Sequence, residues 1–150
     1  MNTGTMCAQW VCKSFGKKTV LRELELTLEP GKLYGLLGRN GAGKTTLLSI
    51  LTAQLAPDRG SVTYGGEPVW ENAALKARIA AIPDDWYYFL QSSVRDMMRF
   101  YRGFYPTFSM ERYNALKEVF QIDERRTIRR LSKGMQKQVA FWLALSCMPD

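Results

Sequence analysis

The chain has 150 residues, of which 46% are hydrophobic and 23% are charged, and its formal net charge is +7. This composition excludes a disordered chain, and the length suffices for one ordinary domain with a hydrophobic core. No apolar run approaches the roughly 18 residues that cross a bilayer, and no charged and then apolar leader opens the chain, so we expect neither a membrane span nor a secretion signal.

Short strand-like segments bounded by glycine or proline occur mainly in the first half of the chain. They are residues 9–15, 24–29, 33–38, 61–66 and 79–83. The turn-like residues 16–18 join the first two, and Gly65 and Gly66 predict a hairpin-type turn. Residues 33–38 are apolar on both faces, which predicts a strand buried in a mostly parallel sheet.

Apolar residues at helical spacing predict a helix from Lys44 to about Leu55 and a short helix over 71–79. Further helices are predicted around 97–104, after Ser109 and after Ser132, with Ser109 as an N-cap. Nine of the 18 aromatic residues lie between residues 86 and 108. We therefore expect an αβ part over 1–85, a helical part over 86–131 and a final helical segment over 132–150.

A glycine-rich turn between an apolar run and a helix fits the pattern G-x-x-x-x-G-K-[ST]. Glycines permit the tight curl that points backbone N–H groups at one phosphate, and the following helix N-terminus adds partial positive charge. Lys44 is expected to reach the outer phosphates, and the Thr45 hydroxyl to bind Mg²⁺. The predicted nucleotide-binding residues, here named the phosphate loop, are Gly38, Arg39, Asn40, Gly41, Ala42, Gly43, Lys44, Thr45 and Thr46.

A second motif lies at the start of the last predicted helix. Residues 131–135 read Leu-Ser-Lys-Gly-Met and are followed by Gln136 and Gln138. This segment resembles the signature of ATP-binding cassette (ABC) ATPases, usually written LSGGQ. We name residues 131–135 the signature segment. The order of motifs over all 150 residues is similar to that of an ABC cassette. The sequence "FYPTFS" before the signature most resembles cassettes of bacterial ABC-2-type exporters.

The resemblance implies an α/β fold of the P-loop NTPase type, with an N-terminal β subdomain and an inserted helical subdomain. It implies a cytoplasmic ATP-binding subunit that pairs with a second cassette, docks on a transmembrane permease at the inner face of the membrane, and binds ATP with Mg²⁺. Each signature then caps the nucleotide of the other cassette, which assigns Ser132, Lys133, Gly134 and Met135 to binding in trans. Phe15 falls where the family stacks an aromatic ring on adenine; the alternative is a core phenylalanine.

Two residues depart from the family pattern. The family usually carries glutamine where this chain has Asp84, whose carboxylate would serve Mg²⁺ more strongly than an amide; the alternative is a solvated turn after Pro83. Lys133 replaces the first signature glycine and adds positive charge. The aromatic region 86–108 is a candidate permease-docking surface by family analogy, and the alternative is a helical core.

The family's next strand, with an Asp for Mg²⁺ and a Glu that activates water, does not occur within these residues, and the later switch histidine is absent because the chain has no histidine. We therefore expect a truncated core and negligible hydrolysis by these 150 residues alone, with transport driven by hydrolysis in the complete protein. Three rival functions stay open: a soluble ABC ATPase acting on ribosomes or DNA, a nucleotide-binding regulatory module without turnover, and a small-molecule P-loop kinase, which the second motif disfavours.

Two further features of composition constrain the chemistry. Cys7, Cys12 and Cys147 leave one thiol unpaired in any scheme and fit no metal site, so we expect reduced thiols in a cytosolic protein. The missing histidines exclude acid–base or metal chemistry by histidine in these residues. Six basic side chains lie within residues 125–137, and we favour a solvated or phosphate-facing surface over a nucleic-acid site.

Overall fold

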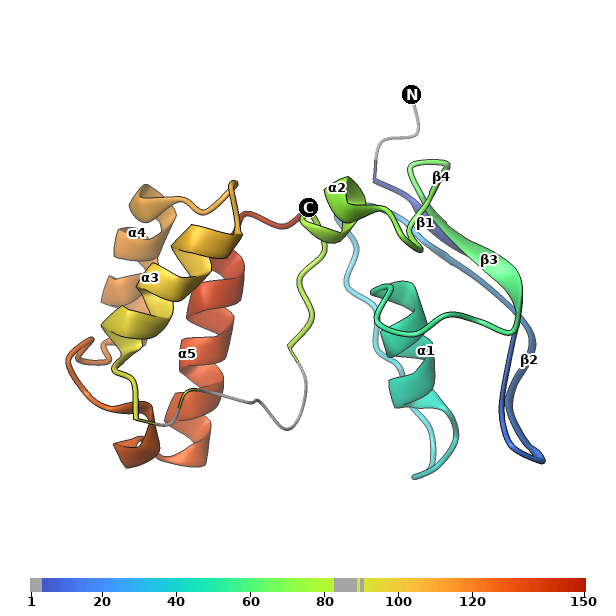
Figure 1. Ribbon diagram of the computed structural model, residues 1–150, viewed down its shortest axis with the longest axis horizontal. Helices are drawn as coiled ribbons and strands as arrows, with labels where there is room; N and C mark the ends of the chain where they lie inside the picture. The colour runs from blue at the N-terminus through green and yellow to red at the C-terminus, as the bar shows by residue number, and fades with distance from the viewer. Residues whose placement is uncertain (1–3, 83–88, 90) are drawn as a thin grey trace. The chain divides into compact units, whose positions relative to one another are not determined.

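The computed structural model describes residues 4–82, 89 and 91–150. The chain divides into two compact units, Met1–Lys76 and Ala77–Asp150 (Figure 1). The predicted boundary at residue 85 lies outside the described residues and stays a prediction. None of the helices that the structure describes has the length and the apolar character needed to cross a membrane.

The first unit is built on a four-stranded antiparallel sheet in the order β2-β1-β3-β4. The strands are β1 (Met6–Phe15), β2 (Lys18–Leu28), β3 (Arg59–Tyr64) and β4 (Glu67–Pro68). The predicted turn at Gly65 and Gly66 is confirmed, since it joins β3 to β4, and the predicted turn over 16–18 is confirmed except that Lys18 already begins β2. At Gly60 a Cβ atom would lie 2.4 Å from the carbonyl oxygens of Gln9 and Trp10, so only glycine fits where β3 pairs with the irregular part of β1 between Gln9 and Cys12.

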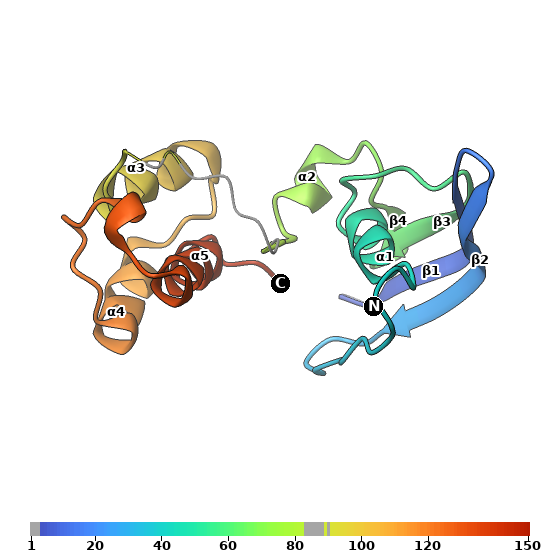
Figure 2. The ribbon, with the colours of Figure 1, turned by 90° about the horizontal axis from the view of Figure 1, so that it is seen from below.

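Helix α1 (Lys44–Leu51) lies against one face of this sheet, as Figures 1 and 2 both show. Leu47, Ile50 and Leu51 are its buried residues. The prediction that this helix continues to about Leu55 is wrong. It ends at Leu51 because the buried residue Ala53 adopts a left-handed backbone, with φ at 54°, which an α-helix cannot contain. The predicted helix over 71–79 is likewise reduced to one turn, α2 (Ala73–Lys76).

The prediction of a buried strand over 33–38 is wrong. These residues form no strand, and the side chains of Leu33 and Leu37 are 101% and 94% exposed. A parallel strand takes its hydrogen bonds from segments distant in sequence. Within the described part of the chain every strand pair is antiparallel and no strand lies alongside 33–38. The apolar run therefore enters the phosphate loop as exposed chain.

Residues 79–82 are also not a strand, which corrects the prediction for 79–83 as far as the structure describes it. They lie in the second unit near the last residues of the chain. The Asp150 amide donates to the Arg78 carbonyl at 3.0 Å, and the two side chains form an ion pair.

The second unit packs three helices around one core: α3 (Val94–Phe104), α4 (Met110–Phe120) and α5 (Lys133–Ser146), with the short 3₁₀ turn η1 (Ile128–Arg130) before α5. Trp142 is fully buried at its centre, stacks on Tyr113 at 4.5 Å between ring centroids, and donates from Nε1 to the Tyr113 carbonyl at 2.8 Å. The predicted stripe on the last helix is confirmed, since it lies in this core. Its members are Val139, Trp142, Leu143 and Ser146.

Serine side chains fix the starts of all three helices, as the sequence predicts for Ser109. The Oγ atoms of Ser93, Ser109 and Ser132 each accept a hydrogen bond from the backbone amide three residues later. Ser93 and Asp96 complete a reciprocal capping box on α3. Local sequence signals thus set where the helices of this unit begin.

Candidate functional site: a glycine-rich loop at a helix N-terminus

The phosphate loop immediately precedes and opens α1 in the first unit. Its residues are exposed up to Ala42, and Gly43 is buried at the N-cap. Gly41 and Gly43 have φ values of 80° and 89°, in the left-handed region that favours glycine. A Cβ atom on Gly43 would lie 2.9 Å from Val20 Cγ1 and 3.2 Å from the Val20 carbonyl oxygen. The loop can therefore approach β2 closely only because residue 43 is glycine.

The start of α1 presents backbone donors toward solvent. Leu47 N donates to the Gly43 carbonyl at 2.8 Å, so the amides of residues 44–46 precede the first intrahelical bond. Among the described residues no side chain caps this helix, because the N-cap is Gly43. Unpaired amides and the positive end of the helix dipole make such a terminus suitable for an anion.

The Lys44 ammonium lies inside the curl of the loop. Its Nζ atom donates to the Gly38 carbonyl at 2.6 Å and to the Arg39 carbonyl at 2.9 Å. The loop is further closed by Ala42 N, which donates to the Arg39 carbonyl at 3.1 Å. These contacts hold a full positive charge beside the amides of α1, so the loop combines the two kinds of group that bind phosphate oxygens.

The residues present fit a phosphate-bound Mg²⁺ better than a metal held by protein alone. The Thr45 side chain is exposed beside Lys44 and offers one oxygen ligand. No cluster of three or more His, Cys, Asp or Glu side chains that could hold a metal occurs in the described ranges. Mg²⁺ usually takes one or two protein ligands together with substrate phosphates and water. Asp84, the other predicted ligand, lies outside the described residues.

Phe15 ends β1 and is 52% exposed, so it is not the core residue that the alternative assigned. Lys13 Nζ lies 5.7 Å from the centre of its ring and also forms an ion pair with Asp58 at 2.8 Å. The Asp58 carboxylate also accepts from the Ser14 amide at 2.7 Å, which ties the end of β1 to the segment before β3. An exposed ring on a fixed strand end is free to stack on a planar base.

The signature segment opens α5 in the second unit. Ser132 is the N-cap, and its Oγ accepts from Met135 N at 3.2 Å. Ser132, Lys133 and Gly134 are exposed. Gln136 ties the signature segment to the residues before it, because its Nε2 donates to the carbonyls of Ile128 and Leu131, each at 3.1 Å. The structure thus presents the predicted trans-binding residues together at one helix terminus.

The basic residues before the signature segment are exposed along the chain that leads to it. Arg126 Nη2 donates to the Arg130 carbonyl at 3.2 Å, and this hydrogen bond links the two ends of residues 126–130. Arg125, Arg129, Arg130 and Lys133 are exposed. The positive charges of these side chains repel one another, so attractive contacts with other residues must offset that repulsion.

Sequence reasoning missed Glu124, which is only 8% exposed. Its carboxylate accepts from Tyr113 OH at 3.0 Å and forms ion pairs with Lys117 and with Arg95, the latter at 3.7 Å. Burial acts to raise the pKa of Glu124, but the hydrogen bonds from Lys117 and Tyr113 and the charge of Arg95 outweigh it, and the pKa lies below its usual value. Nothing in the local pattern distinguishes Glu124 from its exposed neighbour Asp123.

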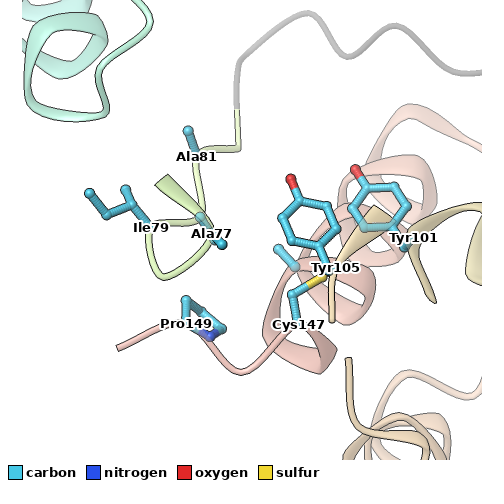
Figure 3. Close-up of a pocket in the computed structure, with 9 residues that line it drawn as sticks. Ala77, Ile79, Ala81, Tyr101, Tyr105, Cys147 and Pro149 are labelled. Atoms are coloured by element: carbon cyan, nitrogen blue, oxygen red, sulfur yellow. The ribbon is translucent and has the colours of Figure 1, made fainter. Parts of the chain in front are cut away.

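A small pocket in the second unit has no described site residue that the sequence predicted in its lining. It has a volume of about 30 Å³, room for one water molecule, and includes Tyr101, Tyr105, Cys147 and Pro149 in its lining (Figure 3). Burial raises the pKa of the Cys147 thiol to about 11. All three cysteines are free thiols, as predicted. This pocket is too small for a nucleotide.

A family profile described as ABC transporter matches residues 21–150. The chain belongs to the ABC transporter family. Over 91% of this chain and 47% of the relative, it is 30% identical to the "ABC transporter ATP-binding protein YtrB" of Bacillus subtilis (strain 168). Over 93% of this chain and 45% of the relative, it is 34% identical to the "Nod factor export ATP-binding protein I" of Cupriavidus pinatubonensis (strain JMP 134 / LMG 1197).

Solved structures confirm the α/β fold of ABC ATPases that the sequence predicts. The "Structure of ATP binding subunit of ABC transporter" superposes with a TM-score of 0.84 at 20% identity, over 96% of this chain and 62% of that one. The "Structure of a bacterial Atm1-family ABC exporter with ATP bound" gives a TM-score of 0.85 at 19% identity, over 99% of this chain and 28% of that one. The chain spans about half the length of the curated relatives named above.

Proposed function

We propose that this chain is the ATP-binding part of an ABC transporter subunit and that its phosphate loop binds the triphosphate of ATP together with Mg²⁺. The observation that carries the proposal is the Lys44 ammonium held 2.6 Å from the Gly38 carbonyl, beside the uncapped N-terminus of α1. Mg²⁺, when bound with the nucleotide, neutralises phosphate charge. The relatives' printed names, which include export and ATP-binding proteins, support the same function.

Each part of the loop has a defined role in this proposal. The amides of residues 44–46 bind phosphate oxygens, Lys44 binds the outer phosphates, and Thr45 offers its hydroxyl to the metal. Phe15 stacks on adenine. Arg39, Asn40 and Ala42 contribute backbone to the curl between the glycines. Asp84 remains a proposed metal ligand and sensor of the membrane partner.

The decisive experiment compares Lys44→Ala with Lys32→Ala, an exposed lysine just before the loop whose partner is Glu29. Both variants lose one positive charge near the loop. A charge-assisted hydrogen bond contributes about 1.5–3 kcal/mol, so Lys44→Ala should weaken binding of a fluorescent ATP analogue by about 10- to 100-fold. Lys32→Ala should bind as the unsubstituted chain does. Equal affinity of all three proteins would refute the proposal.

The signature segment is proposed to bind in trans. In this arrangement a second copy of the chain, or a paired cassette, presents Ser132, Lys133, Gly134 and Met135 to the nucleotide held by the first. Lys133 places one additional cation at the N-terminus of α5, where an approaching phosphate would neutralise it. ATP-dependent association, measured by sedimentation velocity with and without ATP, tests this step, and a monomer at saturating ATP would contradict it.

Docking on a membrane permease is proposed for an aromatic surface made of Phe89 and of Phe100 and Phe104 on α3. Phe89, Phe100 and Phe104 are 58%, 41% and 69% exposed, and the rings of Phe100 and Phe104 lie 4.5 Å apart. These three are therefore not core residues, although Tyr101 and Phe108 do pack on the core. Tyr87 and Tyr88, which the sequence also suggests for docking, lie outside the described residues. An exposed aromatic cluster of this kind favours a partner surface.

The docking proposal is tested by Phe100→Ala/Phe104→Ala in a pull-down of a co-expressed transmembrane permease subunit. Val119→Ala is the matched control, since Val119 is 71% exposed on α4. We expect the double variant to lose the membrane subunit and to keep ATP binding. Retention equal to that of Val119→Ala would refute docking at this surface. The last part of the proposal is that the complete protein hydrolyses the bound ATP and that this hydrolysis drives transport.

A further inference from the structure

The segment that joins α4 to the signature segment has little regular structure of its own. Between Phe120 and Ser132 the only helical element is the 3₁₀ turn η1. It contains four arginines, all exposed: Arg125, Arg126, Arg129 and Arg130. Like charges this close in sequence repel and favour an extended, mobile chain. Something else must hold the segment if Ser132 is to keep a fixed place.

Backbone hydrogen bonds tie the segment to the start of α3. Arg95 N donates to the Glu124 carbonyl at 2.9 Å and Val94 N to the Arg126 carbonyl at 3.2 Å. Ile128 N donates to the Ser92 carbonyl at 3.0 Å, next to an antiparallel bridge between residues 93 and 127. The start of α3 therefore forms one side of a short ladder, and the arginine-rich segment forms the other.

The Glu124 carboxylate links this ladder to α4. It is the one acidic or basic residue that is buried in the described part of the chain. Its oxygens contact Tyr113 and Lys117 on α4 and Arg95 on α3, and none of the arginines that follow it in its own segment. Because its charge is balanced by cations of two other elements, the carboxylate pulls the segment against both helices. Ser132 follows eight residues later in the chain.

We propose that Glu124 is a positioning residue: its ion pairs with Arg95 and Lys117 hold the signature segment in the place from which Ser132–Met135 caps the nucleotide of a second copy. The inference rests on the proposed function for the capping step alone. Loss of the carboxylate leaves the phosphate loop of the same chain intact, because that loop lies in the first unit. It loosens the arginine-rich segment and weakens ATP-dependent association.

The test uses Glu124→Gln, with Glu118→Gln as the matched control because Glu118 is an exposed glutamate on α4. The substituted amide can still accept from Tyr113 OH but no longer pairs with the two cations. Trypsin reports the order of the segment directly, since Arg125, Arg126, Arg129 and Arg130 are its cleavage sites. Cleavage there should be faster by about tenfold in Glu124→Gln, while cleavage at Lys17 in the β1–β2 turn stays unchanged.

The second readout separates positioning from general stability. The affinity of the monomer for a fluorescent ATP analogue should stay within about twofold of the unsubstituted chain, while the ATP concentration that half-saturates association rises by about tenfold. Glu118→Gln should match the unsubstituted chain in every measurement. Circular dichroism confirms folding, and if Glu124→Gln does not fold, Arg95→Gln replaces it, since this change removes one of the two ion pairs and leaves the backbone hydrogen bond from residue 95 to the Glu124 carbonyl in place. About threefold faster cleavage and weaker association are then expected.

The outcomes distinguish the two proposals. Unchanged cleavage, or unchanged association by a folded Glu124→Gln, overturns the role of Glu124 and leaves nucleotide binding untouched. An equal loss of monomer affinity and of association also overturns it, because the effect is then general. Failure of the unsubstituted chain to bind ATP at all overturns the proposed function, and the capping role of Glu124 falls with it.

Discussion

Substitution of Gly43 by alanine tests whether the phosphate loop depends on its close approach to β2. Residue 43 has φ at 89°, and an added Cβ would lie 2.9 Å from Val20 Cγ1, 3.2 Å from Leu21 Cδ2 and 3.2 Å from the Val20 carbonyl oxygen. The left-handed backbone costs a non-glycine residue about 1–2 kcal/mol. Valine is stiff at χ1 and the carbonyl is backbone, so the clash adds about 1–3 kcal/mol, as in an overpacked core.

Gly41→Ala provides the control. Residue 41 has φ at 80°, yet nothing lies within 4 Å of an added Cβ, so only the backbone cost of about 1–2 kcal/mol applies. We therefore expect Gly43→Ala to lower the free energy of unfolding by about 1–3 kcal/mol more than Gly41→Ala does.

Urea unfolding followed by circular dichroism measures this difference in the free energy of unfolding. Titration with a fluorescent ATP analogue measures the affinity of the phosphate loop for nucleotide. Gly43→Ala should also weaken nucleotide binding, because relief of the clash moves the N-terminus of α1 away from β2. If both variants prove equally stable and bind the analogue with equal affinity, the close packing of residue 43 on Val20 does not determine the conformation of the phosphate loop.

Three further outcomes are expected in the second unit. Ser132→Ala removes the hydrogen bond to Met135 N and should lower the free energy of unfolding by about 1 kcal/mol, measured by urea unfolding, with a change near zero refuting the cap. Trp142→Ala should lower it by about 3–5 kcal/mol, because a fully buried ring and its hydrogen bond are lost, and a loss below 1 kcal/mol would contradict the assigned core. Since burial raises the pKa of Cys147 to about 11 from 9.0, the folded chain binds more protons than the unfolded chain between these values, so stability should fall with rising pH by up to about 1.4 kcal/mol per unit in that window. Unfolding followed from pH 8 to 11 should show a smaller slope in Cys147→Ala, and identical slopes would refute this cause.

Several local features could be predicted from the sequence because their causes are local. Serine side chains bond to amides three residues away, so Ser109 could be assigned as a cap and the helix after Ser132 could be placed without tertiary information. The stripe on α5 follows from helical periodicity, and the turn at Gly65 and Gly66 follows from glycine chemistry.

Other features could not be predicted because their causes are distant. Residues 33–38 have the apolar pattern of a buried strand, yet a strand needs a neighbour, and no neighbour for them lies in the described ranges. The helix that opens at Lys44 ends at Leu51 because the chain turns at Ala53 to reach β3, although the leucine spacing continues. Glu124 looks like any acidic residue of a charged segment until α3 and α4 supply its cations.

The sequence by itself determined the family, the glycines and lysine of the phosphate loop and the start of the helix at Ser132, since each depends on residue types at fixed spacing. Only the tertiary structure decided that Gly43 packs on Val20, that Phe15 is exposed and that Glu124 is buried between Arg95 and Lys117. The physical reason is that burial and charge pairing are properties of segments that meet in space, whereas backbone curls and helix caps are set by residues a few positions apart.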